Sequence, residues 1–193
     1  MSQLINPYGG RLQDLLVTPE RASTLKAESH RFPSHTLTRR QLCDLELLVN
    51  GGFSPLQGFL TRAAYESVLH DLRLPQGLPW SLPICLDVPE NVAHQLAEGG
   101  LLGLCDPEGF MLAVLHVEDI WRPDRQREAL LVYGTSSPAH PGARYLLEQT
   151  HDTYVGGTVE GIQSPMHFDF ESLRHTPQVL RRLFDQMGWR RVV

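Results

Sequence analysis

The feature that most constrains the fold is a pair of apolar segments, residues 101–105 and 110–120, joined by a short polar turn. The turn, Asp106-Pro107-Glu108-Gly109, has proline and glycine at positions that suit a β-turn. Two apolar runs joined in this way predict a β-hairpin. We therefore expect a sheet that contains neighbouring antiparallel strands.

Three further segments have strand character. In residues 80–88 apolar and polar side chains alternate, and Pro83 places this strand at a sheet edge or a bulge. Residues 129–133 form an apolar run after a charged stretch, 122–128, which we interpret as a solvated connection. Residues 154–159 are typical of a strand that contains a glycine bulge.

Short helices separate these strands. Thr38 and Gln41 form a capping-box pattern, and apolar residues at helical spacing follow as far as a glycine pair. Residues 61–72 carry a second apolar helical face, and shorter helices are predicted within 89–98 and from His140 onward. The order predicts an α+β fold, a small, mixed, closed or nearly closed β-barrel with short peripheral helices, rather than a doubly wound sheet.

A last helix is predicted over residues 176–188. Thr176 can cap its first turn, Pro177 suits the first helical position, and Gly188 suits the left-handed position after the last turn. The apolar side chains that recur at helical spacing on it are Leu180, Leu183, Phe184 and Met187. This stripe needs a covering partner. Val192 and Val193 then resemble the start of a strand. Ligands of α/β folds bind beyond the carboxyl ends of strands, so we expect the substrate site in sequence beyond this chain.

Composition and charge narrow the function. The 193 residues are 41% hydrophobic and carry a formal net charge of -5, so no overall attraction to nucleic acid or anionic membranes is expected. Neither an apolar run of about 18 residues nor a basic-then-apolar leader occurs, which predicts a cytoplasmic protein without a membrane anchor. Cys43, Cys85 and Cys105 are far apart among apolar neighbours, so we expect buried thiols rather than disulfides or a metal site.

Several kinds of site are disfavoured by residue usage. Lys26 is the only lysine, and no glycine-rich run precedes it, which excludes a P-loop. The nine histidines lie in separate elements without metal-ligand spacing. The loop of residues 51–59 could cradle a phosphate, but a packing turn is favoured because no GxGxxG pattern follows a strand. Ser54 and Ser164 lie outside any nucleophile elbow.

Charged residues give two further alternatives. Asp44 and Glu46 are two residues apart in a helix and face different directions, so they do not form a cooperating carboxylate pair. Arg174, Arg181 and Arg182 could contact a phosphate of a ligand bound near the end of the chain. A solvated helix face is the favoured interpretation, because Arg181 and Arg182 lie opposite the apolar stripe.

One series of motifs extends over nearly the whole chain in a fixed order. Its segments are 40–48, 51–59, 80–88, 133–135, 140–142, 154–157, 174–177 and 188–189. The series resembles the N-terminal domain of ATP sulfurylase, the sulfate adenylyltransferase family. The motif positions, which we expect to be structural, are Asp44, Gly51, Gly52, Phe53, Gly58, Phe59, His140, Pro141, Tyr154, Gly156, Gly157, Arg174, Pro177, Gly188 and Trp189.

The resemblance implies a PUA-like domain over residues 1–170 and the truncated start of an α/β nucleotidyltransferase domain over 171–193. In that family the last strand continues into a Gln-Thr-Arg-Asn segment and a His-x-x-His pair, which bind nucleotide and sulfate and are not in this sequence. The implied reaction of the complete enzyme, a part of sulfate assimilation, is attack by a sulfate oxygen on the α-phosphorus of Mg-ATP, giving adenylyl sulfate and pyrophosphate. Positioned cationic and backbone donors support such chemistry.

We therefore expect no catalytic, cofactor-binding or metal-binding residue in this chain, which should be inactive alone. Its implied partners are the missing catalytic domain or another copy of the chain. A different class of function stays open, a stand-alone PUA-like module that binds RNA or a protein partner. Net acidity and scattered arginines count against RNA, because binding a polyanion needs clustered positive charge.

Overall fold

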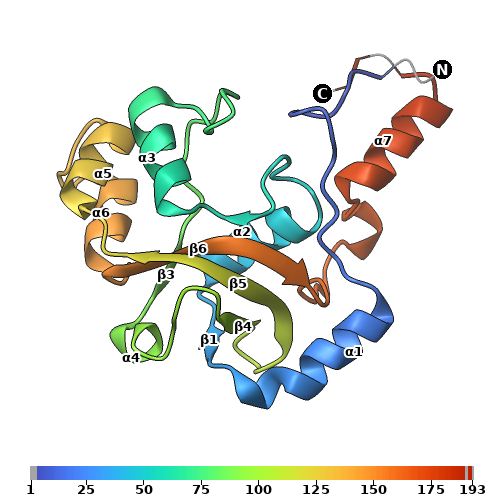
Figure 1. Cartoon of the computed structure of the whole chain (residues 1–193). Coiled ribbons are helices and arrows are strands. Elements are labelled where there is room, and N and C mark those ends of the chain that lie inside the picture. The colour runs from blue at the N-terminus through green and yellow to red at the C-terminus, as the bar shows by residue number, and fades with distance from the viewer. Residues whose placement is uncertain (1–3, 190, 193) are drawn as a thin grey trace.

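A six-stranded mixed sheet forms the centre of the protein in the computed structural model, which describes residues 4–189 and 191–192 (Figure 1). The strands are β1 (Ser34–Thr36), β2 (Gly58–Phe59), β3 (Leu86–Val88), β4 (Leu101–Cys105), β5 (Met111–Trp121) and β6 (Thr153–Gly161). Their order is β1-β4-β5-β6-β2, and β3 also pairs with β6. The predicted hairpin is confirmed as β4 and β5, which are antiparallel neighbours.

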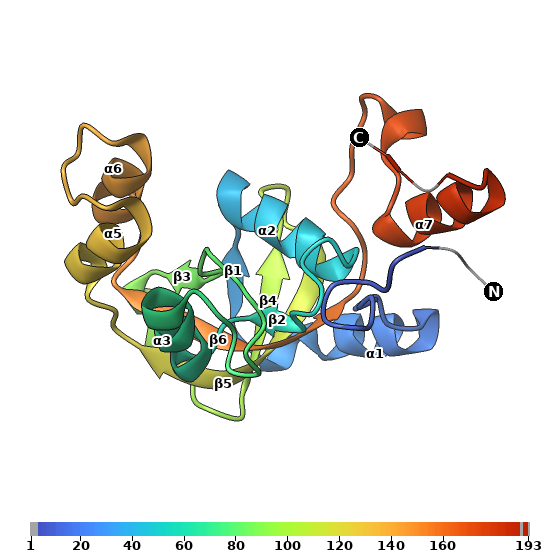
Figure 2. The same ribbon diagram turned by 90° about the horizontal axis from the view of Figure 1, so that it is seen from above.

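The sheet is mixed because one of its pairings is parallel. β1 runs parallel to β4, whereas the pairs β4–β5, β5–β6, β2–β6 and β3–β6 are antiparallel. β5 and β6 curve strongly, as both views show (Figures 1 and 2). No strand pairing within the described ranges joins β1 to β2 or β3. The α+β class and the mixed sheet are confirmed, while closure into a barrel is not.

The described part of the chain contains seven α-helices. They are α1 (Pro19–Glu28), α2 (Arg39–Val49), α3 (Arg62–Asp71), α4 (Glu90–Ala93), α5 (Arg125–Tyr133), α6 (Pro141–Glu148) and α7 (Pro177–Gln186), with 3-10 turns at Ser29–Arg31 and Glu171–Leu173. The predicted capping box is confirmed. Thr38 Oγ1 accepts a hydrogen bond from the Gln41 amide at 3.3 Å, and Gln41 Oε1 accepts one from the Thr38 amide at 2.9 Å.

The expectation of a strand at residues 129–133 is wrong, because this segment is the second half of α5. Asp124 caps the helix by accepting a hydrogen bond from the Arg127 amide at 3.0 Å, and Gly134 ends it with φ +71°. Cap chemistry at both ends therefore outweighs the apolar run between them.

The same helix corrects the prediction of a solvated connection at residues 122–128. Glu128 is only 6% exposed, whereas Leu130 and Leu131 in the apolar run are 54% and 42% exposed. The burial of an acid and the exposure of two leucines reverse what hydropathy alone predicts. The reason is that Glu128 points inward and accepts hydrogen bonds from Tyr65 on α3 and Tyr154 on β6.

Three other elements differ from the prediction in extent or place. Only Leu86–Val88 of residues 80–88 form a strand, and the helix predicted within 89–98 is limited to α4. The bulge predicted at residues 154–159 lies in the neighbouring strand. Gly157 pairs with Val117 and Gly156 with Asp119, so the residue between these two β5 positions has no partner on β6. The glycines of β6 face the bulge rather than forming it.

The main core lies between the sheet and the helices α2 and α3. At one end of it Tyr65, Trp121 and Tyr154 pack together, with ring centroids 5.7–6.0 Å apart. The three thiols are free, and the prediction that all are buried is confirmed only in part. Cys85 is buried and Cys105 is half-buried, but Cys43 is exposed because it points away from the buried face of α2.

Helix α7 and the pair α5–α6 lie at opposite ends of the molecule (Figures 1 and 2). Thr176 caps α7 as predicted, with its Oγ1 accepting a hydrogen bond from the Val179 amide at 3.3 Å. None of the α7 residues is fully buried. Val192 lies in no strand, and Val193 is outside the described residues, so the predicted strand at this point is not shown. No helix in the described ranges is long and apolar enough to cross a membrane.

Candidate functional site

The motif glycines of β2 and β6 allow strands to approach closely. A Cβ atom on Gly58 would lie 2.0 Å from the Gly157 carbonyl oxygen, and one on Gly157 would lie 1.9 Å from the His116 oxygen. Gly157 also has φ +150°, which side chains rarely adopt. Gly156 packs against the backbone at Leu60 in the same way. At each of these positions the close approach of the backbone leaves no room for a Cβ atom, which explains why the residue is glycine.

The loop of residues 51–59 is a packing turn. The first four amide groups of this loop are already occupied. Gly51 and Phe53 donate to carbonyl oxygens in the last turn of α2, Gly52 donates to the Asn50 side chain, and Ser54 donates to the Gly51 carbonyl oxygen. Phe53 packs edge-on against Trp80 with ring centroids 6.1 Å apart. Phe59 belongs to the core, as a residue of β2.

Most other motif positions begin or end helices. His140 caps α6 by accepting a hydrogen bond from the Ala143 amide at 3.3 Å, and Pro141 is the first residue of that helix. Pro177 begins α7 in the same way. After α7, Gly188 has φ +67° and Trp189 packs on Phe184 at 6.1 Å.

Arg174 does not contact any described residue that could form part of a phosphate site. It forms an ion pair with Asp169 at 2.7 Å on the surface. Arg181 contacts the Ile5 carbonyl oxygen. Asp44 and Glu46 face different directions as expected, because Asp44 pairs with Arg40 while Glu46 pairs with His167.

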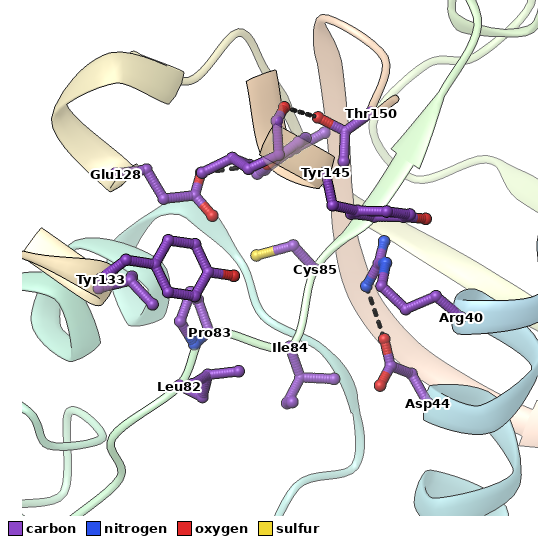
Figure 3. A pocket seen from close by; sticks show the side chains of 13 residues that line it. Arg40, Asp44, Leu82, Pro83, Ile84, Cys85, Glu128, Tyr133, Tyr145 and Thr150 are labelled. Carbon is purple, nitrogen blue, oxygen red and sulfur yellow. Dashed lines mark hydrogen bonds and ion pairs between the residues drawn. The ribbon is translucent and has the colours of Figure 1, made fainter. Parts of the chain in front are cut away.

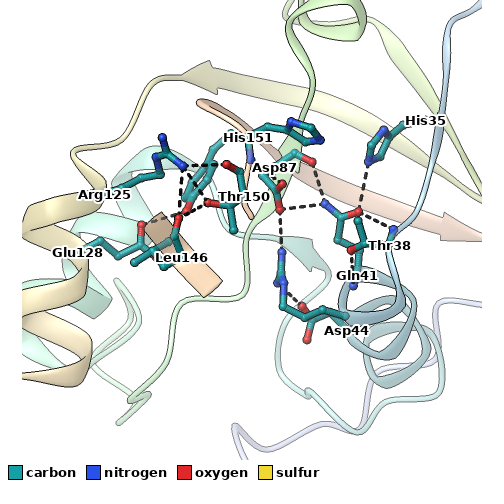
Figure 4. A network of polar contacts seen from close by, with 12 residues as sticks. His35, Thr38, Gln41, Asp44, Asp87, Arg125, Glu128, Leu146, Thr150 and His151 are labelled. Carbon is teal, nitrogen blue, oxygen red and sulfur yellow. Dashed lines mark hydrogen bonds and ion pairs between the residues drawn. The ribbon is translucent and has the colours of Figure 1, made fainter. Parts of the chain in front are cut away.

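Asp44 leads into a polar network that joins α2 to β3 (Figure 4). Arg40 binds Asp44 through Nη1 at 2.7 Å and Asp87 through Nη2 at 2.8 Å. The second oxygen of Asp87 accepts a hydrogen bond from the His151 amide at 3.0 Å. Asp87 is 3% exposed, so both of its oxygens are satisfied within the protein.

Gln41 is the centre of this network and is fully buried. Its Nε2 donates to the carbonyl oxygen of Asp87 at 2.8 Å and to its Oδ1 at 2.9 Å. Its Oε1 lies 3.2 Å from His35 Nε2, besides completing the capping box with Thr38. One side chain therefore fixes the start of α2, the strand β3 and a buried histidine.

Burial and neighbouring charges shift the pKa values of this network in different directions. Burial lowers the pKa of His35 below its usual value. Burial also raises the pKa of Asp44, against the lowering effect of Arg40. For Arg40, burial favours the neutral form, but Asp44, Tyr145 and Asp87 outweigh it and raise the pKa, so the guanidinium stays charged.

A pocket of about 210 Å³ adjoins the network, between residues 82–85 and the pair α5–α6 (Figure 3). Arg40 and Asp44 form one side, with the Arg40 guanidinium 5.7 Å from the centre of the Tyr145 ring. Glu128 and Tyr133 form the other side, and Cys85 lies between the two sides. Burial raises the pKa of the Cys85 thiol, which makes it a poor nucleophile.

Glu128 is the most unusual residue of the pocket. Its Oε2 accepts hydrogen bonds from Tyr65 at 2.9 Å and from Tyr154 at 3.0 Å, so the motif residue Tyr154 serves to hold a buried acid. Burial raises the pKa of Glu128, although the two tyrosine hydrogen bonds oppose the rise. The pocket thus offers recognition groups but no nucleophile paired with a base, and no group of metal ligands occurs within the described residues.

The network and pocket residues were not identified from the sequence as a group. The sequence pattern indicates only a helix cap at Gln41, a strand at Asp87 and a solvated connection at Glu128. In the sequence, Asp87 and Glu128 are acids next to apolar residues, and this is the local sign that they become buried. The partners lie 46 residues apart for Gln41 and Asp87, and 63 apart for Tyr65 and Glu128, so no local pattern joins them.

Residues 5–164 match the family model described as a PUA-like domain. The chain belongs to the PUA-like domain family. It is 45% identical over 191 residues to a sulfate adenylyltransferase of Kluyveromyces lactis, a match that covers 97% of this chain and 38% of the relative. A sulfate adenylyltransferase of Gibberella zeae is 46% identical over 191 residues, covering 97% of this chain and 33% of the relative.

Among solved structures, the chain is similar to one described as a hexameric APS kinase from Thiobacillus denitrificans. The TM-score is 0.76 and the sequence identity 37%, and the match covers 97% of this chain and 32% of the other. This PUA-like chain therefore spans about a third of the length of the proteins it matches. The resemblance stated from the motifs is confirmed at the level of the family and of its relatives.

Proposed function

We propose that the chain is the PUA-like portion of a sulfate adenylyltransferase, the cytoplasmic enzyme of sulfate assimilation that forms adenylyl sulfate and pyrophosphate from Mg-ATP and sulfate. The observation that carries the proposal is the match to the Kluyveromyces lactis enzyme, which extends over nearly all of this chain at 45% identity. In this proposal Mg-ATP and sulfate bind to the other two thirds of the enzyme. The chain contributes a folded support rather than reacting groups.

The surface near the end of the PUA-like match supports a large intramolecular partner. Four apolar side chains between residue 164 and α7 are 71–86% exposed, and they are Met166, Phe168, Phe170 and Leu173. Several large apolar side chains exposed within one short segment are typical of a contact with another protein surface. We propose that it packs against the catalytic portion, with the division between the two portions near residue 170.

Self-association is a second proposed contact. The similar Thiobacillus denitrificans protein is described as hexameric, and the match to it covers 97% of this chain. Another copy of the complete enzyme is therefore a further proposed partner.

A pyrophosphate-release assay with Mg-ATP and sulfate tests where the chemistry resides, with the Kluyveromyces lactis enzyme as the positive control. We expect no turnover from the pure chain, because it lacks a phosphate-binding loop among its described residues. Turnover by the chain would overturn the assignment of the chemistry to the remaining two thirds. Tight, steeply salt-dependent RNA binding by the same preparation would instead favour a stand-alone RNA-binding module.

A further inference from the structure

The pocket contains a buried acid, Glu128, that forms no ion pair within the described residues, although the charges of Arg40 and Arg125 act on it from farther away. Both tyrosine hydroxyls donate to Oε2, and no hydrogen bond formed within residues 4–189 reaches Oε1. Among the described residues, the enclosed side-chain polar atoms without a hydrogen-bond partner are Arg40 Nε and Trp121 Nε1, and Glu128 Oε1 is not one of them. It is therefore an acceptor that a molecule in the pocket can reach. Burying an unpaired carboxylate is unfavourable, so a donor at this point would be stabilising.

The neighbouring arginines are already compensated. Arg40 binds the carboxylates of Asp44 and Asp87. Arg125 binds Asp152 and donates to the Thr150 carbonyl oxygen at 2.7 Å. Two acids therefore balance Arg40, and the charge left without a partner at the pocket is negative when Glu128 is ionised. An anionic ligand would meet this carboxylate without a free cation to offset it.

The rest of the lining suits a compact apolar body. Leu82, Ile84 and Val132 supply aliphatic walls, and the ring of Tyr133 adds an aromatic wall, while Arg40 already lies against the ring of Tyr145. The volume of about 210 Å³ exceeds that of an engineered cavity of about 150 Å³ that holds benzene. A single ring with a short polar substituent fills such a space.

We propose that this pocket binds a small organic cation, a single ring or branched apolar body with one amidinium or ammonium group that donates to Glu128 Oε1. The cation pairs with Glu128 at one side of the pocket while the apolar body contacts Tyr133 and the aliphatic walls. The inference does not depend on the proposed sulfate adenylyltransferase activity, because the test uses binding alone.

Benzamidine is a suitable probe, with benzamide as the neutral control of the same shape and benzoate as the anionic control. In an amide-detected NMR titration of the whole chain, we expect saturable benzamidine shifts confined to pocket residues. Benzamide and benzoate should bind at least about tenfold more weakly, the effect of losing one charge-assisted hydrogen bond. Equal binding of the three compounds, or no saturable binding of benzamidine, would overturn the proposal.

Two variants separate the role of Glu128 from general changes. Glu128→Gln keeps the shape and removes the charge, and it should weaken benzamidine binding about tenfold. Glu108→Gln is the matched control, since Glu108 is exposed in the β4–β5 turn and should leave binding unchanged. Equal loss in both variants, or in neither, would contradict the pairing.

Two of the three cysteines, Cys85 and Cys43, provide a readout on the protein without substitutions, should Glu128→Gln fail to fold. Cys85 lines the pocket and Cys43 is exposed outside it. Benzamidine should slow modification of Cys85 by a small thiosulfonate reagent and leave the rate at Cys43 unchanged. Unchanged modification of Cys85 at a saturating benzamidine concentration would refute occupancy of this pocket.

Discussion

Replacement of Gln41 tests most sharply whether the buried network holds α2 against β3. In Gln41→Leu the volume is nearly retained, but the Asp87 carbonyl oxygen loses its Nε2 donor at 2.8 Å. His35 Nε2 loses a partner at 3.2 Å, and the Thr38 amide loses the acceptor of the capping box at 2.9 Å. Asp87 keeps its contacts with Arg40 and the His151 amide.

The size of the effect follows from these lost contacts. Each buried group left without a partner is destabilising by about 1–3 kcal/mol, and the Thr38 amide can recover a bond to water. We therefore expect Gln41→Leu to lower the free energy of unfolding by about 3 kcal/mol. With a urea m-value of about 2 kcal/mol/M, the midpoint should fall by about 1.5 M with little change in m.

Gln95→Leu is the matched control for this measurement. Gln95 is exposed and donates one hydrogen bond, to the Asn91 carbonyl oxygen at 2.8 Å. Its loss should change the free energy of unfolding by at most about 0.5 kcal/mol. A Gln41→Leu protein that unfolds at the same urea concentration as Gln95→Leu would refute the claim that the network stabilises the fold.

Two further predictions concern single residues. Gly58→Ala should lower the free energy of unfolding by about 3 kcal/mol, because its Cβ would lie 2.0 Å from the Gly157 oxygen and force two paired strands apart. Gly77→Ala, with open space but φ +87°, should lose only about 1 kcal/mol, and equal losses in urea unfolding would count against the steric argument. Glu128 should make the free energy of unfolding depend on pH, because burial raises its pKa in the folded state above the usual 4.5. Between the unfolded and the folded pKa, the folded state binds a proton that the unfolded state has released. That contribution is complete below the unfolded pKa and is lost as the pH rises through the folded pKa, so the wild type should lose stability relative to Glu128→Gln as the pH rises above about 4.5. A difference between the two proteins that stays constant with pH would contradict this sign.

Local signals in the sequence predicted much of the fold. The β4–β5 hairpin follows from the Asp106–Gly109 turn, and the starts of α2 and α7 follow from their capping threonines. Each of these features depends on residues a few positions apart, where the physical cause lies in the backbone itself. Predictions of this kind were confirmed.

Features that depend on distant contacts were not predictable in the same way. The apolar run at residues 129–133 was expected to be a strand, but its leucines are on the exposed face of α5. The network around Gln41 joins residues on α2, β3 and the segment before β6, and the pocket adds α5 and α6. Only the packing of these elements shows that Asp87 and Glu128 are buried.

The motif glycines can be found from the sequence, but the reason for them depends on distant contacts. Their importance was expected from the family resemblance, and the reason became clear only from the approach of β2, β5 and β6. Gly157 meets the His116 oxygen across the β5–β6 pair, while Gly58 meets Gly157 from β2. A glycine pattern alone does not reveal which neighbouring strand requires it.

The central claim, that this chain is the PUA-like portion of a sulfate adenylyltransferase, is tested most directly by an exchange of segments. The part of the Kluyveromyces lactis enzyme that matches this chain is replaced by the chain itself, and the rate of adenylyl sulfate formation is measured. We expect a folded chimera with kcat/KM within about tenfold of the parent enzyme, a change of about 1.4 kcal/mol. A folded chimera that forms no adenylyl sulfate would contradict the account.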